Sequence, residues 1–290
     1  IYTDIQGQVY YMTDLSSWTR IGSNRVTTLT KGDFDSDGNE DDLAGVNKNG
    51  YVIYTTDLVD WTKSGANRFS RLISFDEDED GVNDDLAGIN LNQYIVYTTD
   101  LRATDWQKSG RNKFSSLISI DLDGNGSQEA LAGINLNQYV VYTADISATD
   151  WQKSGQNKFS SFISGDFDGN DREDDLAGVN LNRYVVYTGS ITSTDWHKSG
   201  QNKFSTVVAI DLAGTTAKEA LAGLNLNRYA VYTDNVAGGD WIRIGTNSLS
   251  TLVAGDFDGD GAADDLAGIN LSDNLIYTTD RSAWTQIEKP

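Results

Sequence analysis

The sequence repeats with a fixed period. The tripeptide Leu-Ala-Gly begins at Leu43, Leu86, Leu131, Leu176, Leu221 and Leu266, so successive copies lie 43, 45, 45, 45 and 45 residues apart. The seven tryptophans keep the same period and add an N-terminal unit without the tripeptide; they are Trp18, Trp61, Trp106, Trp151, Trp196, Trp241 and Trp284. A period of this length is typical of a solenoid or a propeller, in which each unit buries its apolar face against its neighbours.

One unit, residues 114–158, has the pattern of four short strands and no helical periodicity. Residues 114–120 are apolar and β-branched, 130–134 are small, 139–143 are rich in Tyr and Val, and a fourth strand begins at Trp151 and ends at Ser154 and Gly155. Four antiparallel strands repeated radially form the blade of a β-propeller. Because such sheets twist strongly and close naturally into a ring, we predict an all-β propeller, with residues 1–290 as a single domain.

The expected units are 1–25 (partial), 26–68, 69–113, 114–158, 159–203, 204–248 and 249–290. Residues 1–25 align with the second, third and fourth strands of a unit, which gives 27 expected strands in all. This count favours seven blades, one of which lacks its first strand. Six blades are the alternative, and they would leave three strands without a sheet.

Composition excludes several classes of function. The net charge of −21 argues against partners rich in phosphate, such as nucleic acid or an anionic membrane surface. The chain has no cysteine, so disulfides and thiol chemistry do not contribute. Apolar runs such as 139–142 are far shorter than the roughly 18–20 residues that cross a bilayer, so we expect no membrane insertion. The chain begins at Ile1 rather than Met, which fits removal of a preceding segment, and we expect a secreted or extracellular protein.

Acidic loops follow the first strand of the units. Oxygen-bearing side chains occupy loop positions one, three, five and nine, and position seven can offer its backbone carbonyl. Ca²⁺ takes about six to eight oxygen ligands, and the EF-hand loop uses the same early spacing. We therefore predict up to five structural Ca²⁺ ions, held by Asp33, Asp35, Asp37, Asn39 and Asp41; by Asp76, Asp78, Asp80, Val82 and Asp84; by Asp121, Asp123, Asn125, Ser127 and Glu129; by Asp166, Asp168, Asn170, Arg172 and Asp174; and by Asp256, Asp258, Asp260, Ala262 and Asp264.

The loop at 211–219 differs from these five. Ala213 occupies its position three and Lys218 lies next to its last position, so we predict that this loop binds no ion. Clusters of Asp, Asn and Gly can also form polar turns without any metal. A turn alone does not require carboxylates at alternate positions, where they would repel one another without a cation.

The run DFDGDGAADDLAGIN at 256–270 resembles the FG-GAP or VCBS-type repeats of integrin α-subunit propellers. That resemblance implies calcium in the loop between the first two strands. The whole unit, with an aromatic first strand, a YVVYT strand and a final DW…G segment, is similar to the unit of propeller lectins of the tachylectin and Psathyrella types. That second resemblance implies carbohydrate binding.

Connections within an antiparallel blade alternate between its two ends, so the Asn-Leu-Asn turns and the Ser-Gly-x-Asn-Lys-Phe links are expected opposite the acidic loops. Amides, hydroxyls and aromatic faces suit a sugar, and repetition adds avidity. We predict a multivalent lectin for glycans or glycoproteins. Its candidate ligand residues are Asn90, Asn92, Tyr94, Trp106, Asn112, Asn135, Asn137, Tyr139, Trp151, Asn157, Asn180, Asn182, Tyr184, Trp196 and Asn202. The alternatives are that the tryptophans pack between blades and that the asparagines only shape turns.

Two other functions compete with the lectin. An integrin-like, protein-binding adhesion module predicts one continuous contact patch that does not repeat. A carbohydrate-active enzyme is the third hypothesis. The lone His197 stands where other units have Gln107 or Gln152, and no Ser-His or Cys-His pair is available as a nucleophile, so we expect no enzyme.

Overall fold

The fold is built from β-strands. The computed structural model describes residues 1–4, 6–12, 17–102, 106–170, 172–214 and 218–289. All regular structure within these ranges is strand, and none of these residues forms a helix of the length and apolarity needed to cross a membrane.

The strands recur with the sequence period. They are β1 (Tyr2–Thr3), β2 (Gln8–Tyr11), β3 (Thr19–Gly32), β4 (Asp42–Asn47), β5 (Tyr51–Thr55), β6 (Thr62–Phe75), β7 (Asp85–Asn90), β8 (Ile95–Thr98), β9 (Gln107–Ser109), β10 (Phe114–Ile120), β11 (Ala130–Asn135), β12 (Tyr139–Thr143), β13 (Gln152–Gly165), β14 (Asp175–Asn180), β15 (Tyr184–Thr188), β16 (His197–Ile210), β17 (Ala220–Asn225), β18 (Tyr229–Thr233), β19 (Ile242–Ser248), β20 (Val253–Gly255), β21 (Asp265–Ile269), β22 (Leu275–Thr278) and β23 (Thr285–Ile287).

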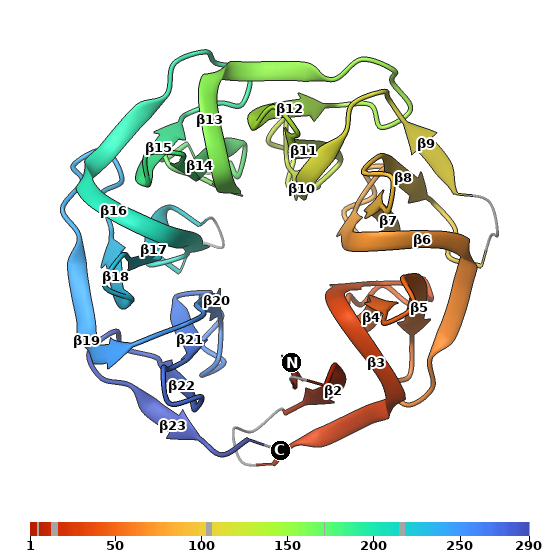
Figure 1. The fold of residues 1–290 in the computed structure, drawn as a ribbon, viewed down its shortest axis with the longest axis horizontal. Helices are drawn as coiled ribbons and strands as arrows, with labels where there is room; N and C mark the ends of the chain where they lie inside the picture. The colour runs from red at the N-terminus through yellow and green to blue at the C-terminus, as the bar shows by residue number, and fades with distance from the viewer. Residues whose placement is uncertain (5, 13–16, 103–105, 171, 215–217, 290) are drawn as a thin grey trace. The chain divides into compact units, whose positions relative to one another are not determined.

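Neighbouring strands pair in chain order, in the series β1 to β9, β10 to β19 and β20 to β23. A strand of 14 residues joins one unit to the next at β3, β6, β13 and β16, whereas two shorter strands take its place at β9 with β10 and at β19 with β20. Each long strand serves two successive units. In β16, Lys198 pairs with Val186 of β15, whereas Val207 pairs with Gly223 of β17, and both pairings are antiparallel. One strand therefore supplies the fourth strand of one unit and the first strand of the next, as the course of β16 shows (Figure 1).

This arrangement corrects one predicted strand boundary. The fourth strand of unit 114–158 was expected to end at Ser154 and Gly155, but β13 begins at Gln152 and continues to Gly165. Gly155 has a φ of 62°, in the left-handed region where a residue without Cβ is relaxed. The register also shifts between Phe159 and Ser161. The strand therefore bends from one sheet to the next instead of stopping.

Contacts group the chain into two compact units, Ile1–Asn137 with Val141–Lys153, and Gln138–Val140 with Ser154–Lys289. The single domain over 1–290 remains a prediction. At the N-terminus, β1, β2 and the first half of β3 pair with one another, so residues 1–25 do form three strands. The number of blades also remains a prediction.

The two sequence periods meet in one packing motif, which the second compact unit illustrates. The rings of Phe159 and Trp196 lie 4.7 Å apart between centroids. A Cβ on Gly178, the glycine of Leu-Ala-Gly, would lie 2.8 Å from Phe159 Cδ1, and a Cβ on Gly155 would lie 2.7 Å from Trp196 Cδ1. The same aromatic pair recurs at 4.3 to 4.7 Å as Phe69 with Trp106, Phe114 with Trp151 and Phe204 with Trp241. The Leu-Ala-Gly glycine thus packs on a phenylalanine of its own sheet, whereas the tryptophan also packs on a glycine in the last strand of the preceding sheet.

Candidate functional site

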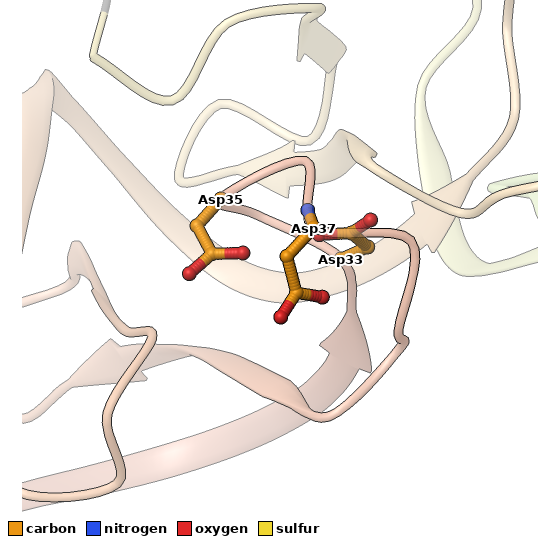
Figure 2. Close-up of side chains that lie close together, drawn as sticks. All are labelled: Asp33, Asp35 and Asp37. Carbon is orange, nitrogen blue, oxygen red and sulfur yellow. The ribbon is translucent and has the colours of Figure 1, made fainter.

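The acidic loops bring carboxylates together at one end of each sheet. In each of five loops, carboxylate oxygens of three residues lie within 4.8 Å of one another. Figure 2 shows the first of these clusters, between β3 and β4. The clusters are Asp33, Asp35 and Asp37; Asp76, Asp78 and Asp80; Asp121, Asp123 and Glu129; Asp166, Asp168 and Asp175; and Asp256, Asp258 and Asp260.

The aspartate at loop position one shapes the loop. Asp33 is buried, and its carboxylate accepts hydrogen bonds from the backbone N–H of Asp37 at 3.1 Å and of Gly38 at 2.7 Å. Asp76 accepts the equivalent bonds from Asp80 and Gly81. The backbone is therefore wrapped around this carboxylate, and the side chains at positions three and five gather beside it.

An aspartate at position ten, which the sequence analysis missed, closes the loop from the other side. Asp175 Oδ2 accepts hydrogen bonds from the backbone N–H of Phe167 and of Asp168, both at 2.7 Å. Its other oxygen, Oδ1, is buried without a hydrogen-bond partner among the described residues. The equivalent residues are Asp42, Asp85 and Asp265. Asp265 Oδ1 is buried in the same way, and because a buried oxygen without a partner is costly, a bound cation would stabilise both groups.

Two loops reach the same arrangement with a longer side chain. Where position ten is alanine, the glutamate at position nine folds back, and Glu129 Oε1 accepts the backbone N–H of Leu122 at 2.9 Å. Glu219 accepts the corresponding N–H of Leu212. The second oxygens of both glutamates are buried without a partner in the described part of the chain. The two arrangements can be told apart in the sequence, because the dipeptide directly before Leu-Ala-Gly is either Asp-Asp or Glu-Ala.

Burial and mutual repulsion disfavour the charged form of these carboxyls. Burial, with nearby carboxylates, raises the pKa of Asp42 to about 6 and the pKa of Asp85 and Asp175 to about 7. A bound divalent cation would reverse this preference, since it stabilises the ionised form. Clustered hard oxygens with partnerless buried atoms therefore fit a hard cation such as Ca²⁺.

The other predicted metal ligands have different surroundings in the structure. Among the described residues, position nine joins a cluster only in the third loop, through Glu129. Asp264 instead forms an ion pair with Arg281 at 2.5 Å, Asp41 is exposed, and Asp174 keeps one buried oxygen without a partner among the described residues. Asp84 at position nine, the asparagines Asn125 and Asn170 at position five, and Asn39, Val82, Ser127, Arg172 and Ala262 at position seven remain predicted ligands.

The loop at 211–219 is described only in part, because residues 215–217 lie outside the described residues. Lys218 Nζ forms an ion pair with Glu173 of the preceding loop at 2.9 Å. A fixed ammonium group thus lies beside this loop. That the loop binds no ion remains a prediction.

The other end of the second strand carries the Asn-Leu-Asn turns. The first asparagine holds the turn: Asn180 Oδ1 accepts the backbone N–H of Asn182 and of Tyr184, both at 3.0 Å. Asn90 accepts the two equivalent bonds and Asn135 accepts the backbone N–H of Asn137, whereas Asn92, Asn137 and Asn182 are exposed. The links lie against the turns, as predicted, because the N–H of Leu181 donates to the carbonyl of Lys158. Asn112, Asn157 and Asn202 belong to these links, and none of them is fully buried.

The aromatic residues predicted to contact a ligand are covered. Lys108 Nζ lies 3.6 Å from the ring centroid of Tyr94, and Lys198 Nζ lies 3.5 Å from that of Tyr184. Lys158 lies over Tyr139 at 5.2 Å. Each tyrosine thus holds a cation over its face.

The tryptophans also have packing roles. Trp106 and Trp151 are only 8% exposed, and each packs against a phenylalanine. Trp151 Nε1 also donates a hydrogen bond to Ser109 Oγ at 3.2 Å. Trp196 packs in the same way against Phe159. This geometry matches the alternative in which tryptophan packs between sheets.

Known structures with the same architecture identify the fold. YCF48 bound to D1 peptide superposes with a TM-score of 0.59 at 12% identity, over 98% of this chain and 86% of that one. YCF48 from Cyanidioschyzon merolae gives 0.58 at 12% identity over 97% and 85%, and the WD40 β-propeller domain of Doa1 gives 0.59 at 10% identity over 96% and 88%. The chain has a β-propeller fold. No protein-family model and no curated protein sequence matches it.

Each blade therefore presents two chemically different ends. Opposite the acidic loops, the middle leucine of the turn is exposed in five blades, at 54, 47, 45, 50 and 57% for Leu91, Leu136, Leu181, Leu226 and Leu271. Hollows lie beside two of these turns, at Leu91 and at Leu226. One of about 320 Å³ is lined by Asn67, Arg68, Asn90, Leu91 and Asn92. The sequence signal for this surface was a leucine at the centre of a turn that is otherwise polar.

Proposed function

We propose that this β-propeller is a calcium-stabilised binding module that takes polypeptide segments on its Asn-Leu-Asn turns and carries out no chemistry. The observation that carries the proposal is the repeated exposed leucine beside a polar hollow. A partner's apolar side chain can cover the exposed half of such a leucine, and the leucine repeats at the same place in successive turns. YCF48 bound to D1 peptide supports the idea, because it is a propeller described with a peptide.

Calcium is the second part of the proposal. Each of the five carboxylate clusters would hold one ion through its three acidic residues and neighbouring oxygens. The ion would neutralise a group of negative charges whose ionised form is disfavoured by burial, and it would fix the loop between the first two strands. The role is structural, because the clusters lie at the opposite end of the second strand from the turns. A secreted or extracellular location would supply the calcium.

The leucine proposal is tested with peptides selected from a random phage-displayed library on the immobilised full chain in Ca²⁺. Leu91→Ser and Leu226→Ser should weaken a selected peptide several-fold each, whereas Val59→Ser should not. Val59 is a matched control, since it is 60% exposed but lies outside the turns. Equal binding by all three variants would contradict the proposal.

Carbohydrate binding is the second candidate, and the repeated exposed amides of Asn92, Asn137 and Asn182 favour it. Amides can both donate to and accept from sugar hydroxyls. A glycan array probed with the full chain, with and without chelator, separates the two. Saturable binding to a glycan, with no peptide enriched from the library, would show that the ligand is a sugar and not a polypeptide. Silence in both assays would reject a binding module altogether.

The calcium proposal is tested independently by thermal unfolding in Ca²⁺ and in chelator. A ligand at about 100 times its Kd stabilises a folded chain by about 2.7 kcal/mol for each site. We therefore expect a large upward shift of the midpoint in Ca²⁺. An unchanged midpoint would refute bound calcium and would leave the proposal of a polypeptide ligand unaffected.

A further inference from the structure

The residue that follows each Asn-Leu-Asn turn, or its counterpart Asn47-Lys48-Asn49 or Asn270-Leu271-Ser272, has a left-handed backbone. Gly50 has a φ of 85°, and the same position has 70° at Gln93, Gln138 and Arg183, 64° at Arg228 and 63° at Asp273. Glycine is relaxed in this region, whereas a residue with Cβ is held there at a cost. Glycine would therefore be the least costly residue here, yet most units carry a longer side chain, and this side chain differs from blade to blade. A role in binding would explain both facts.

Two of these residues line the same hollow. Arg183 and Arg228 line a single hollow of about 440 Å³ in the second compact unit, together with Asn225 and Leu226. They are the only successive pair of arginines at this position, because the others are Gly50, Gln93, Gln138 and Asp273. One hollow in the repeat has thus diverged to carry two guanidinium groups.

The hollow is positively charged and rich in donors. None of its lining residues is acidic, and the ion pairs among the described residues involve neither arginine. Asn225 Oδ1 accepts the backbone N–H of Asn227 at 2.9 Å and of Tyr229 at 3.1 Å, which leaves its Nδ2 as a donor. The next residue in the series, Asp273, is paired with Lys289 at 2.8 Å.

We propose that this hollow binds the carboxylate of an acidic side chain in a polypeptide partner. Arginine offers parallel N–H donors that match a carboxylate, and the two guanidinium groups supply the charge. Leu226 is 50% exposed at the same hollow, where it can contact an apolar side chain next to the acidic one. The inference rests on the proposed function and names the ligand chemistry at one of its sites.

The experiment uses the full chain in Ca²⁺ on a peptide array in which every peptide with Asp or Glu is paired with its Asn or Gln twin. We expect acidic peptides with a neighbouring leucine to bind on the order of 10- to 100-fold more tightly than their twins, the range for a charge-assisted hydrogen bond. Binding should weaken as salt rises. Oligogalacturonate and inorganic phosphate, titrated separately, should bind less tightly than the peptides.

Glycine substitutions separate binding from folding. The Arg183→Gly and Arg228→Gly double variant removes both guanidinium groups from positions where glycine is relaxed, so its thermal midpoint should stay equal or rise. Its affinity for acidic peptides should fall to that of the amide twins. Gln93→Gly is the matched control, because it relaxes the same turn position, at a φ of 70°, without touching this hollow.

Each other result has a definite meaning. If peptides bind but acid and amide twins bind equally, or the double variant binds like the parent, the carboxylate site is refuted and the peptide-binding function stands. Preferential binding of oligogalacturonate or phosphate refutes a polypeptide as the source of the anion. If no peptide binds at all, the proposed function fails together with this inference.

Discussion

The contact of Gly155 with Trp196 is the sharpest test of how the blades are held together. A Cβ at Gly155 would lie 2.7 Å from both Cδ1 and Nε1 of Trp196, in a backbone with a φ of 62°. Gly155→Ala therefore meets two costs. Holding an L-residue in the left-handed region costs about 1–2 kcal/mol, and forcing the tryptophan to move adds about 1–3 kcal/mol. We expect a loss of about 2–5 kcal/mol in the free energy of unfolding.

Gly50→Ala is the matched control. Its φ is 85°, but the nearest atom to an added Cβ is Arg68 Nε, the end of a flexible side chain, at 3.3 Å. Only the backbone cost of about 1–2 kcal/mol should remain. Any stabilisation from a less flexible unfolded chain is common to both variants and cancels. Urea unfolding followed by tryptophan fluorescence in Ca²⁺ measures the difference. If Gly155→Ala costs no more than Gly50→Ala, the close packing of tryptophan on glycine is refuted.

Three further predictions concern the carboxylate clusters. Because burial raises the pKa of Asp85 and Asp175 to about 7, their folded forms bind protons more tightly than their unfolded forms, so the thermal midpoint in chelator should rise as the pH falls from about 7 to 4. A midpoint that falls in this window would contradict the raised pKa. Asp175→Asn should stabilise the protein in chelator, where it removes a buried charge, and destabilise it in Ca²⁺; the same sign in both thermal scans would refute a metal at this cluster. Asp258→Asn should lower the calcium content by one ion per chain, as measured by elemental analysis after dialysis, and an unchanged content would contradict its role as a ligand.

The fold could be predicted from the sequence because the same strand and turn pattern recurs about every 45 residues. The strands at 114–120 and 139–143 were predicted with the bounds of β10 and β12, since apolar β-branched runs between turns leave few other structures. The continuity of β13 through Gly155 could not be predicted. Glycine marks a turn in most contexts, and only the pairing partners on both sides reveal that the strand bends without ending.

The carboxylate clusters were predictable for the same reason, but their closing residue was not. Alternation within a loop places positions one, three and five together, and all three are found in the first, second and fifth clusters. Asp42 and Asp85 lie at the start of the following strand, where their side chains turn back to the N–H of Phe34 and of Glu77. A side chain at the start of a strand can lie on either side of the sheet, so the spacing within the loop did not indicate which aspartate closes it.

The packing motif also explains how one hollow can differ from the others. Trp196 packs on Phe159 of its own sheet and on Gly155 of the preceding one, and this set repeats along the chain. The turn residue at Arg183 is exposed and makes its contact to the core through its backbone, since its carbonyl accepts the N–H of Phe204 at 2.8 Å. Any side chain that tolerates the left-handed backbone can therefore occupy this position without disturbing the blade. The core residues keep the architecture constant, whereas the side chain at the turn position can vary and so change which ligand each blade binds.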